Sequence, residues 1–295
     1  MWFIYTIITI LLWGGTDLFY KLSSNEEEAY SHLKITVCVG IVMGVHAISF
    51  ILISKTQYKL MSIIQYLPVS LLYILAMVFG YIGLRYIRLS IASPIGNSSG
   101  AIAFILCFIF LRERMTLLQL TAVIVISIGI FVLAVIHKRE DVVGAIVDIK
   151  DEKYSKGALA ILFPIFYCII DGAGTFADAM VLDRVMKEEH ALISYELTFL
   201  TISILVLFWL LVVKKQRMEF IKQKEGIAAA VLETAGQFFY VKAMAVNAML
   251  TAPLVACYSI ASILLSRIFL KEKLTVKQYL IIALIVVAIG ILGIE

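Results

Sequence analysis

Two polar stripes interrupt otherwise apolar segments of this chain. The stripes are Asp171, Thr175 and Asp178, and Glu233, Gln237 and Tyr240. Both keep the spacing i, i+4, i+7, which places side chains on one face of an α-helix. An ionisable group inside a membrane is costly, so it indicates a function by default. The spacing predicts carboxylates that line a central aqueous cavity and attract a cation, a proton or an amine-bearing substrate.

Within this set we expect Asp171 and Glu233 to serve in coupling or in cation recognition. Trp13 and Tyr258 offer aromatic faces for cation–π contacts with a substrate. The remaining candidates for the cavity are Asp17, Thr175, Gln237, Tyr240 and Asn97.

Structural explanations compete for several polar residues. Asp17, Asp178 and Glu196 fit an interface or a helix end equally well, because a carboxylate costs little there. His46 fits a structural histidine with a satisfied ring. Tyr240 fits either the cavity wall or the packing symmetry of a repeat.

The segments that must position these residues are membrane helices. Of the 295 residues 62% are hydrophobic and 16% are charged, and the mean hydropathy is +1.00. Soluble domains are about 45–50% apolar and about 25% charged. A spanning helix needs about 20 apolar residues, which predicts an all-α polytopic membrane protein with ten transmembrane helices. The expected spans are 2–20, 33–54, 60–84, 89–111, 115–136, 157–181, 191–213, 226–246, 248–266 and 274–294.

Composition also excludes several function classes. The net charge of +4 comes from basic residues scattered through loops, which argues against a nucleic-acid partner. The four cysteines lie far apart and without metal-ligand spacing, so we expect no metal and no cofactor.

The second half of the chain repeats the first at an offset of 159 residues. Residues 81–119 match residues 240–278 at nine identical positions, among them Tyr81 with Tyr240 and Pro94 with Pro253. Five spans per half is an odd number, which predicts two inverted five-helix repeats, a typical feature of secondary transporters. We expect the first repeat over 1–136, a linker over 137–156 and the second repeat over 157–295. A short interfacial helix over 142–149 is a weaker expectation.

The repeated prolines, Pro94 and Pro253, predict kinks in the fourth and ninth spans. A proline frees a backbone carbonyl one turn earlier, and the recurrence in both halves favours gating over simple packing. Gly96-Asn97-Ser98-Ser99-Gly100 also fits the G-x-S-x-G pattern of serine hydrolases. That pattern needs a strand–turn–helix context, whereas here it lies in an uncharged span, so we do not expect an enzyme.

The sequence resembles the EamA-like family of the drug/metabolite transporter superfamily. The resemblance rests on Leu111-Arg-Glu-Arg-Met-Thr116, its echo Leu270-Lys-Glu-Lys-Leu-Thr275, the pair Trp13-Gly14 and the fifth-helix glycines Gly129 and Gly290. It implies a cavity between the two halves and transport of amino acids, nucleotide sugars, choline-like cations, other metabolites or drugs. It also implies both termini in the cytoplasm. The loop charges predict the opposite, because Lys and Arg gather in the connections that follow the odd-numbered spans.

These observations together predict a secondary, gradient-driven transporter of a small polar or amine-containing metabolite, such as an amino acid. The alternatives are a multidrug or organic-cation efflux transporter, a membrane enzyme or lipid-handling protein, and a receptor or scaffold. We expect a multi-pass protein of a bacterial inner or plasma membrane, present as a monomer or homodimer. Its partners are the lipid bilayer, a small-molecule substrate and protons as a candidate driving ion.

Overall fold

The computed structural model is all-helical over the residues that it describes. These are 1–24, 28, 30–111, 115–147 and 160–294, without the side chains of 137–147. Nine of the helical segments in this part are long and apolar enough to cross a membrane, and a shorter apolar helix completes the ninth span. The predicted architecture of ten spans is therefore confirmed. The helices are α1 Trp2–Ser23, α2 Ser31–Ser54, α3 Met61–Tyr86, α4 Leu89–Asn97, α5 Ser99–Phe110, α6 Leu117–Val147, α8 Leu162–Arg184, α9 Glu188–Phe208, α10 Lys224–Val255, α11 Tyr258–Phe269 and α12 Val276–Ile294.

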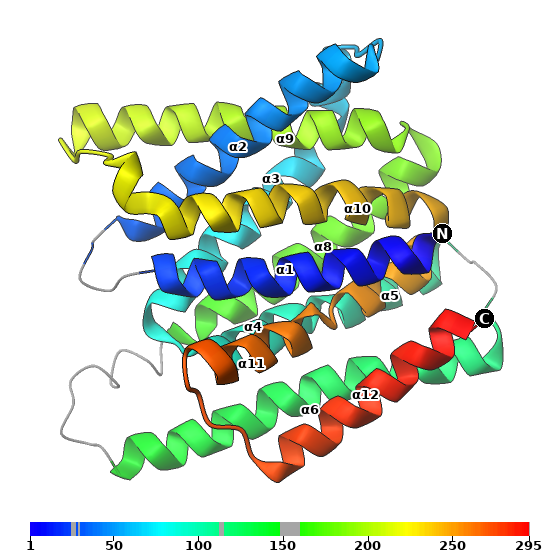
Figure 1. Ribbon diagram of the computed structural model, residues 1–295. Coiled ribbons are helices and arrows are strands. Elements are labelled where there is room, and N and C mark those ends of the chain that lie inside the picture. Colours follow the sequence, from blue (N-terminus) through cyan, green and yellow to red (C-terminus); the bar gives the residue numbers. More distant parts are fainter. Residues whose placement is uncertain (25–27, 29, 112–114, 148–159, 295) are drawn as a thin grey trace.

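The two halves pack as a pseudo-symmetric pair (Figure 1). Helix α1 packs on α10, and the equivalent pair in the other half is α8 on α3. The contact of α1 with α11 is likewise matched by that of α8 with α5, and that of α2 with α10 by that of α9 with α3. The contact of α4 with α11 is matched by that of the end of α10 with α5, and two further pairs, α2 with α9 and α6 with α12, join equivalent elements of the two halves. Exchanging the halves therefore returns the same pairs, which is the pattern of a two-fold relation between inverted repeats.

The fourth and ninth spans are broken at equivalent positions. The fourth span consists of α4 and α5, which meet at Ser98. The ninth consists of the end of α10 and α11, separated by Ala256 and Cys257. Cys257 is the repeat equivalent of Ser98, since 257 − 98 = 159. Each break follows the repeated proline by four residues, whereas the carbonyl that a proline frees lies one turn before it.

Two element boundaries differ from those expected. Helix α10 continues from the eighth span into the ninth, although Asn247 inside it has the non-helical angles φ −156° and ψ 86°. The Asn247 side chain accepts a hydrogen bond from the Leu250 backbone N–H at 3.0 Å, which caps the segment that follows. Helix α6 runs on to Val147, into the expected linker, so the expected short helix over 142–149 is in part a continuation of α6. The rest of that linker lies outside the described residues.

The repeated Thr-x-x-Gln element caps the last helix of each half. The Gln119 side chain accepts a hydrogen bond from the Thr116 backbone N–H at 3.0 Å, and Gln278 does the same for Thr275 at 2.6 Å. In the first half the Thr116 hydroxyl also accepts a hydrogen bond from the Gln119 backbone N–H at 3.1 Å, which completes a capping box, whereas the buried Thr275 hydroxyl has no such partner among the residues that the structure describes. The motif that carries the family resemblance is thus explained in part by helix capping.

Glu272 of the same motif reaches across to the other half. Its carboxylate accepts hydrogen bonds from the backbone N–H groups of Leu89 at 3.3 Å and Ser90 at 3.0 Å, in the first turn of α4. A negative charge is favourable at a helix N-terminus, where backbone donors lack partners. This contact fixes the start of α4, which carries polar residues toward the interior.

Candidate functional site

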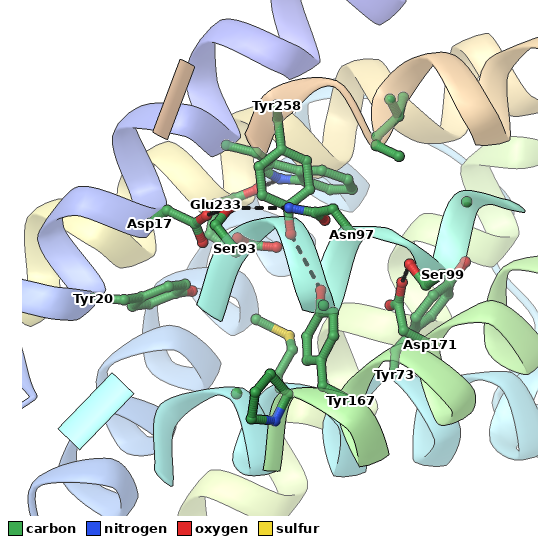
Figure 2. Close-up of a pocket in the computed structure, with 18 of the residues that line it drawn as sticks. Asp17, Tyr20, Tyr73, Ser93, Asn97, Ser99, Tyr167, Asp171, Glu233 and Tyr258 are labelled. Carbon is green, nitrogen blue, oxygen red and sulfur yellow. Dashed lines mark hydrogen bonds between the residues drawn. The ribbon is translucent and has the colours of Figure 1, made fainter. Parts of the chain in front are cut away.

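A cavity of about 110 Å³ lies between the two halves (Figure 2). By volume it has room for roughly seven to eleven water molecules. Its lining comes mainly from the C-terminal halves of α1 and α3, the N-terminal half of α8, α4 and the middle of α10. The cavity therefore extends from the middle of the bundle toward the end where α1 and α3 finish and α4, α8 and α10 begin. All nine residues predicted for substrate or coupling line it: Trp13, Asp17, Asn97, Asp171, Thr175, Glu233, Gln237, Tyr240 and Tyr258.

Three carboxylates from three helices face this cavity. Asp17 of α1 accepts hydrogen bonds from Ser93 of α4 at 2.6 Å and from Ser262 of α11 at 2.7 Å. Asp171 of α8 accepts one from Ser99 of α5 at 2.7 Å. Serine hydroxyls can orient a carboxylate without neutralising its charge.

Glu233 of α10 is the third carboxylate of the cavity. It interacts electrostatically with both aspartates, and more strongly with Asp17 than with Asp171. The hydroxyl of Tyr20 lies close to the Glu233 carboxylate. Among the described residues that line the cavity, none is Lys, Arg or His. The site therefore collects negative charge without a basic side chain to balance it.

Aromatic side chains form much of the remaining wall. The Trp13 ring lies 5.0 Å from the ring of Tyr240 and 5.7 Å from that of Tyr258, centroid to centroid. The Tyr258 hydroxyl shares a hydrogen bond of 3.2 Å with Tyr167. A cation near such rings gains attraction from their negative faces.

The break in the fourth span directs polar side chains into the cavity. Asn97 at the end of α4 donates a hydrogen bond to the Ser93 hydroxyl, one turn earlier, at 3.1 Å. Ser93 in turn contacts Asp17, so the three side chains form one connected group. Pro94 and Pro253 are buried in the broken spans but do not line the cavity. Their predicted gating role stays a prediction.

Asp178, the last residue of the α8 stripe, lies beyond the cavity in a separate cluster. It is fully buried and accepts hydrogen bonds from Tyr66 at 2.6 Å and Tyr73 at 3.4 Å. Tyr73 also shares a hydrogen bond of 2.9 Å with Tyr240 on the cavity wall. Tyr66 lies in the first third of α3 and Asp178 in the last third of α8, so this cluster lies toward the end of the bundle opposite the start of α4.

A second contact lies farther out on the same side. Tyr58, between α2 and α3, shares a hydrogen bond of 2.7 Å with Ser194 of α9. Burial raises the pKa of Tyr58 above its ordinary value, so the hydroxyl keeps its proton at neutral pH.

Glu196 and His46 form a pair between α9 and α2. The His46 Nδ1 atom lies 2.8 Å and 2.9 Å from the two carboxylate oxygens of Glu196, which is fully buried. The histidine thus has the partner expected of a structural residue. Lys242, near the end of the eighth span, has its Nζ atom 4.6 Å from the ring centroid of Phe238.

Comparison with known proteins identifies the family of this chain. The profile of the EamA-like transporter family matches residues 1–135 and 158–294. The chain belongs to the EamA-like transporter family. A solved structure described as "Crystal structure of protein" is similar over 99% of this chain and 96% of its own, with a TM-score of 0.65 and 16% identity, which supports the fold alone. No curated protein matches the sequence.

Family membership makes this EamA-like protein a multi-pass membrane transporter for a small molecule rather than an enzyme. Ser98, the residue that fits the hydrolase pattern, lies at the break between α4 and α5. The family does not specify the substrate, which has to be argued from the cavity.

Several cavity residues of this EamA-like transporter were missed by sequence reasoning. Ser93 lies four residues before Asn97, and that spacing could have placed both on one helical face. Tyr20 lies three residues after Asp17, which is the same kind of signal. Ser99 and Ser262 had no such signal, because a serine in an apolar span usually bonds its own helix backbone. Tyr73 and Tyr167 are single aromatic residues within apolar runs.

Proposed function

We propose that this protein is a secondary, alternating-access transporter of a small amine-bearing metabolite. The observation that carries the proposal is the presence of three carboxylates without a basic side chain in one cavity. Placing a carboxylate away from bulk water is costly unless a partner compensates its charge. A cationic substrate, or a proton, would supply that compensation each time the cavity is occupied.

The surroundings of the carboxylates support an amine over a simple metal cation. Aromatic rings such as Trp13 and Tyr258 attract organic ammonium groups. Oxygen-rich, flexible coordination is what a hard metal ion needs, and within the described residues no group of three or more acidic, histidine or cysteine side chains has metal-site geometry. The same aromatic rings also favour the second candidate, a transporter of larger organic cations.

Alternating access follows from the position of the cavity. The cavity lies toward one end, and the cluster of Tyr66, Tyr73 and Asp178 closes the other. In the opposite-facing state this cluster would open and the end near α4 would close. With the orientation that the loop charges predict, the present cavity would face the cytoplasm of a bacterial cell. Reversible protonation of Asp171 and Glu233 would link transport to a proton gradient.

The decisive experiment is uptake into proteoliposomes with and without an imposed pH gradient. Amines that stabilise the purified protein in a thermal-shift screen serve as substrates, since a ligand stabilises by RT ln(1 + [L]/Kd). Asp171→Asn and Glu233→Gln should each abolish gradient-driven uptake. Asp183→Asn, which changes an exposed carboxylate on the same helix α8, is the matched control.

Unchanged gradient-dependent uptake in both cavity variants, at equal incorporation, would refute the coupling assignment. A preference for anionic or neutral metabolites would refute the amine itself. Bulky organic cations as the better substrates would favour the second candidate.

A further inference from the structure

The carboxylates of the cavity form two separate anionic groups. Asp17 and Glu233 lie together on one side, and Asp171 lies on the opposite side, beside Ser99 (Figure 2). The stronger electrostatic interaction of Glu233 with Asp17 than with Asp171 agrees with this division. The cavity therefore offers ammonium groups two different binding positions.

Each group keeps an oxygen free for a ligand. Ser93 and Ser262 both donate to Oδ2 of Asp17, and Ser99 donates to Oδ2 of Asp171. In the described part of the chain, no hydrogen bond is formed by Oδ1 of either aspartate, and neither Oδ1 is sealed from the cavity. The serines thus orient two carboxylates whose second oxygens remain open to a donor.

Aromatic rings, with the amide of Asn97 beside them, line the space between the two groups (Figure 2). Tyr167 packs closely against Gly96 of the broken fourth span, and its hydroxyl shares a hydrogen bond with that of Tyr258. The faces of these rings suit a hydrocarbon chain, whose contact with them removes apolar surface from water.

We propose that the cargo carries two positive charges, one at each end of a short apolar chain, as in an α,ω-diammonium compound. One ammonium group would bind between Asp17 and Glu233 and the other at Asp171. This inference rests on the proposed function and names its substrate class. A monoamine would leave one anionic group without a counter-charge, and a charged hydrogen bond unmade at that end.

The test is a binding series on the purified full-length protein. The probes are α,ω-diaminoalkanes from diaminopropane to diaminooctane, each compared with the monoamine of the same chain length. Wild type should bind its best diamine about tenfold more tightly than the matching monoamine or better, because a charged hydrogen bond is gained. The advantage should peak at one chain length, set by the separation of the two groups.

Two variants test which carboxylate binds each ammonium group of the diamine. Asp171→Asn should remove the diamine advantage but leave monoamine binding, and Asp17→Asn should also remove the advantage, from the other side. Asp183→Asn should change neither affinity. Because the two aspartates lie on different helices, a folding defect in one variant leaves the other to decide.

The outcomes separate this inference from the proposed function. Equal affinity for diamines and monoamines in wild type would refute a doubly charged cargo but leave the proposal of amine transport intact. A diamine advantage that survives both substitutions would have the same meaning. If neither class binds, both proposals fail.

Discussion

The crossing of the two broken spans should tolerate no added methyl group at Gly100. A Cβ at this position would lie 2.7 Å from the Ala256 Cβ, 3.0 Å from the Ala252 carbonyl oxygen and 3.3 Å from the Pro253 Cα. Two of these three atoms belong to the backbone, so they cannot turn away as the end of a flexible side chain would. Gly100→Ala must therefore push α5 and α10 apart at the cavity wall.

The magnitude follows from a matched comparison. Overpacking in a well-packed interior costs about 1–3 kcal/mol. Alanine also gains up to about 1 kcal/mol over glycine in a helix, and Gly290→Ala in α12 shares that gain without any atom within 4 Å of its new Cβ. The difference in unfolding free energy between the two variants, about 1–3 kcal/mol, isolates the clash. It corresponds to roughly 2–4 °C in melting temperature per kcal/mol.

A second substitution tests the cause. Ala256→Gly removes the closest of the three atoms, so the double variant Gly100→Ala with Ala256→Gly should recover part of the lost stability. The contact with the Ala252 carbonyl would remain. Thermal unfolding of the four proteins in one detergent gives the interaction energy directly. Equal melting temperatures for Gly100→Ala and Gly290→Ala would refute the close crossing.

Three further outcomes are expected. Glu272→Ala should destabilise the protein by about 1–3 kcal/mol, as two backbone donors of α4 lose their acceptor, and Glu272→Gln should keep part of that stability in the same thermal assay. Tyr66→Phe should shift the protein toward the state open on its far side, read as faster labelling of a cysteine introduced at Ser62, and a slower rate would contradict the closing role. Lys222→Cys, on a cysteine-free background, should resist an impermeant thiol reagent in intact cells, whereas ready labelling would reverse the orientation.

The spans and the repeat were predictable because both depend on the bilayer. Hydrophobic length decides which segments cross, and the offset of 159 residues needs no three-dimensional information. The boundaries were less predictable where the chain does not leave the membrane environment. Asn247 gives only a one-residue break between the eighth and ninth spans, so α10 runs through it.

The cavity residues were predictable where a helical stripe marked them. Asp171 and Thr175 lie on the cavity wall as the spacing of the stripe suggests, and Glu233, Gln237 and Tyr240 do as well. The same spacing also suggested Asp178, which instead packs with tyrosines of α3, because a helix face longer than the cavity meets other neighbours. The serine donors to Asp17 come from α4 and α11, and only the tertiary fold brings these elements to one carboxylate.

The pseudo-symmetric pairing of the halves has a consequence for the balance between conformations. If the halves exchange their shapes, the same helix pairs re-form with the opening on the other side, so the backbone alone gives two basins of nearly equal depth. The cavity carboxylates break that equality, because the repeat equivalents of Asp17, Asp171 and Glu233 are Phe176, Leu12 and Ile74. Side chains that differ between the halves, rather than the backbone fold, then set which way the empty carrier faces. Since each 1.4 kcal/mol changes a population ratio about tenfold, a substitution at these positions should shift the balance between the two states measurably.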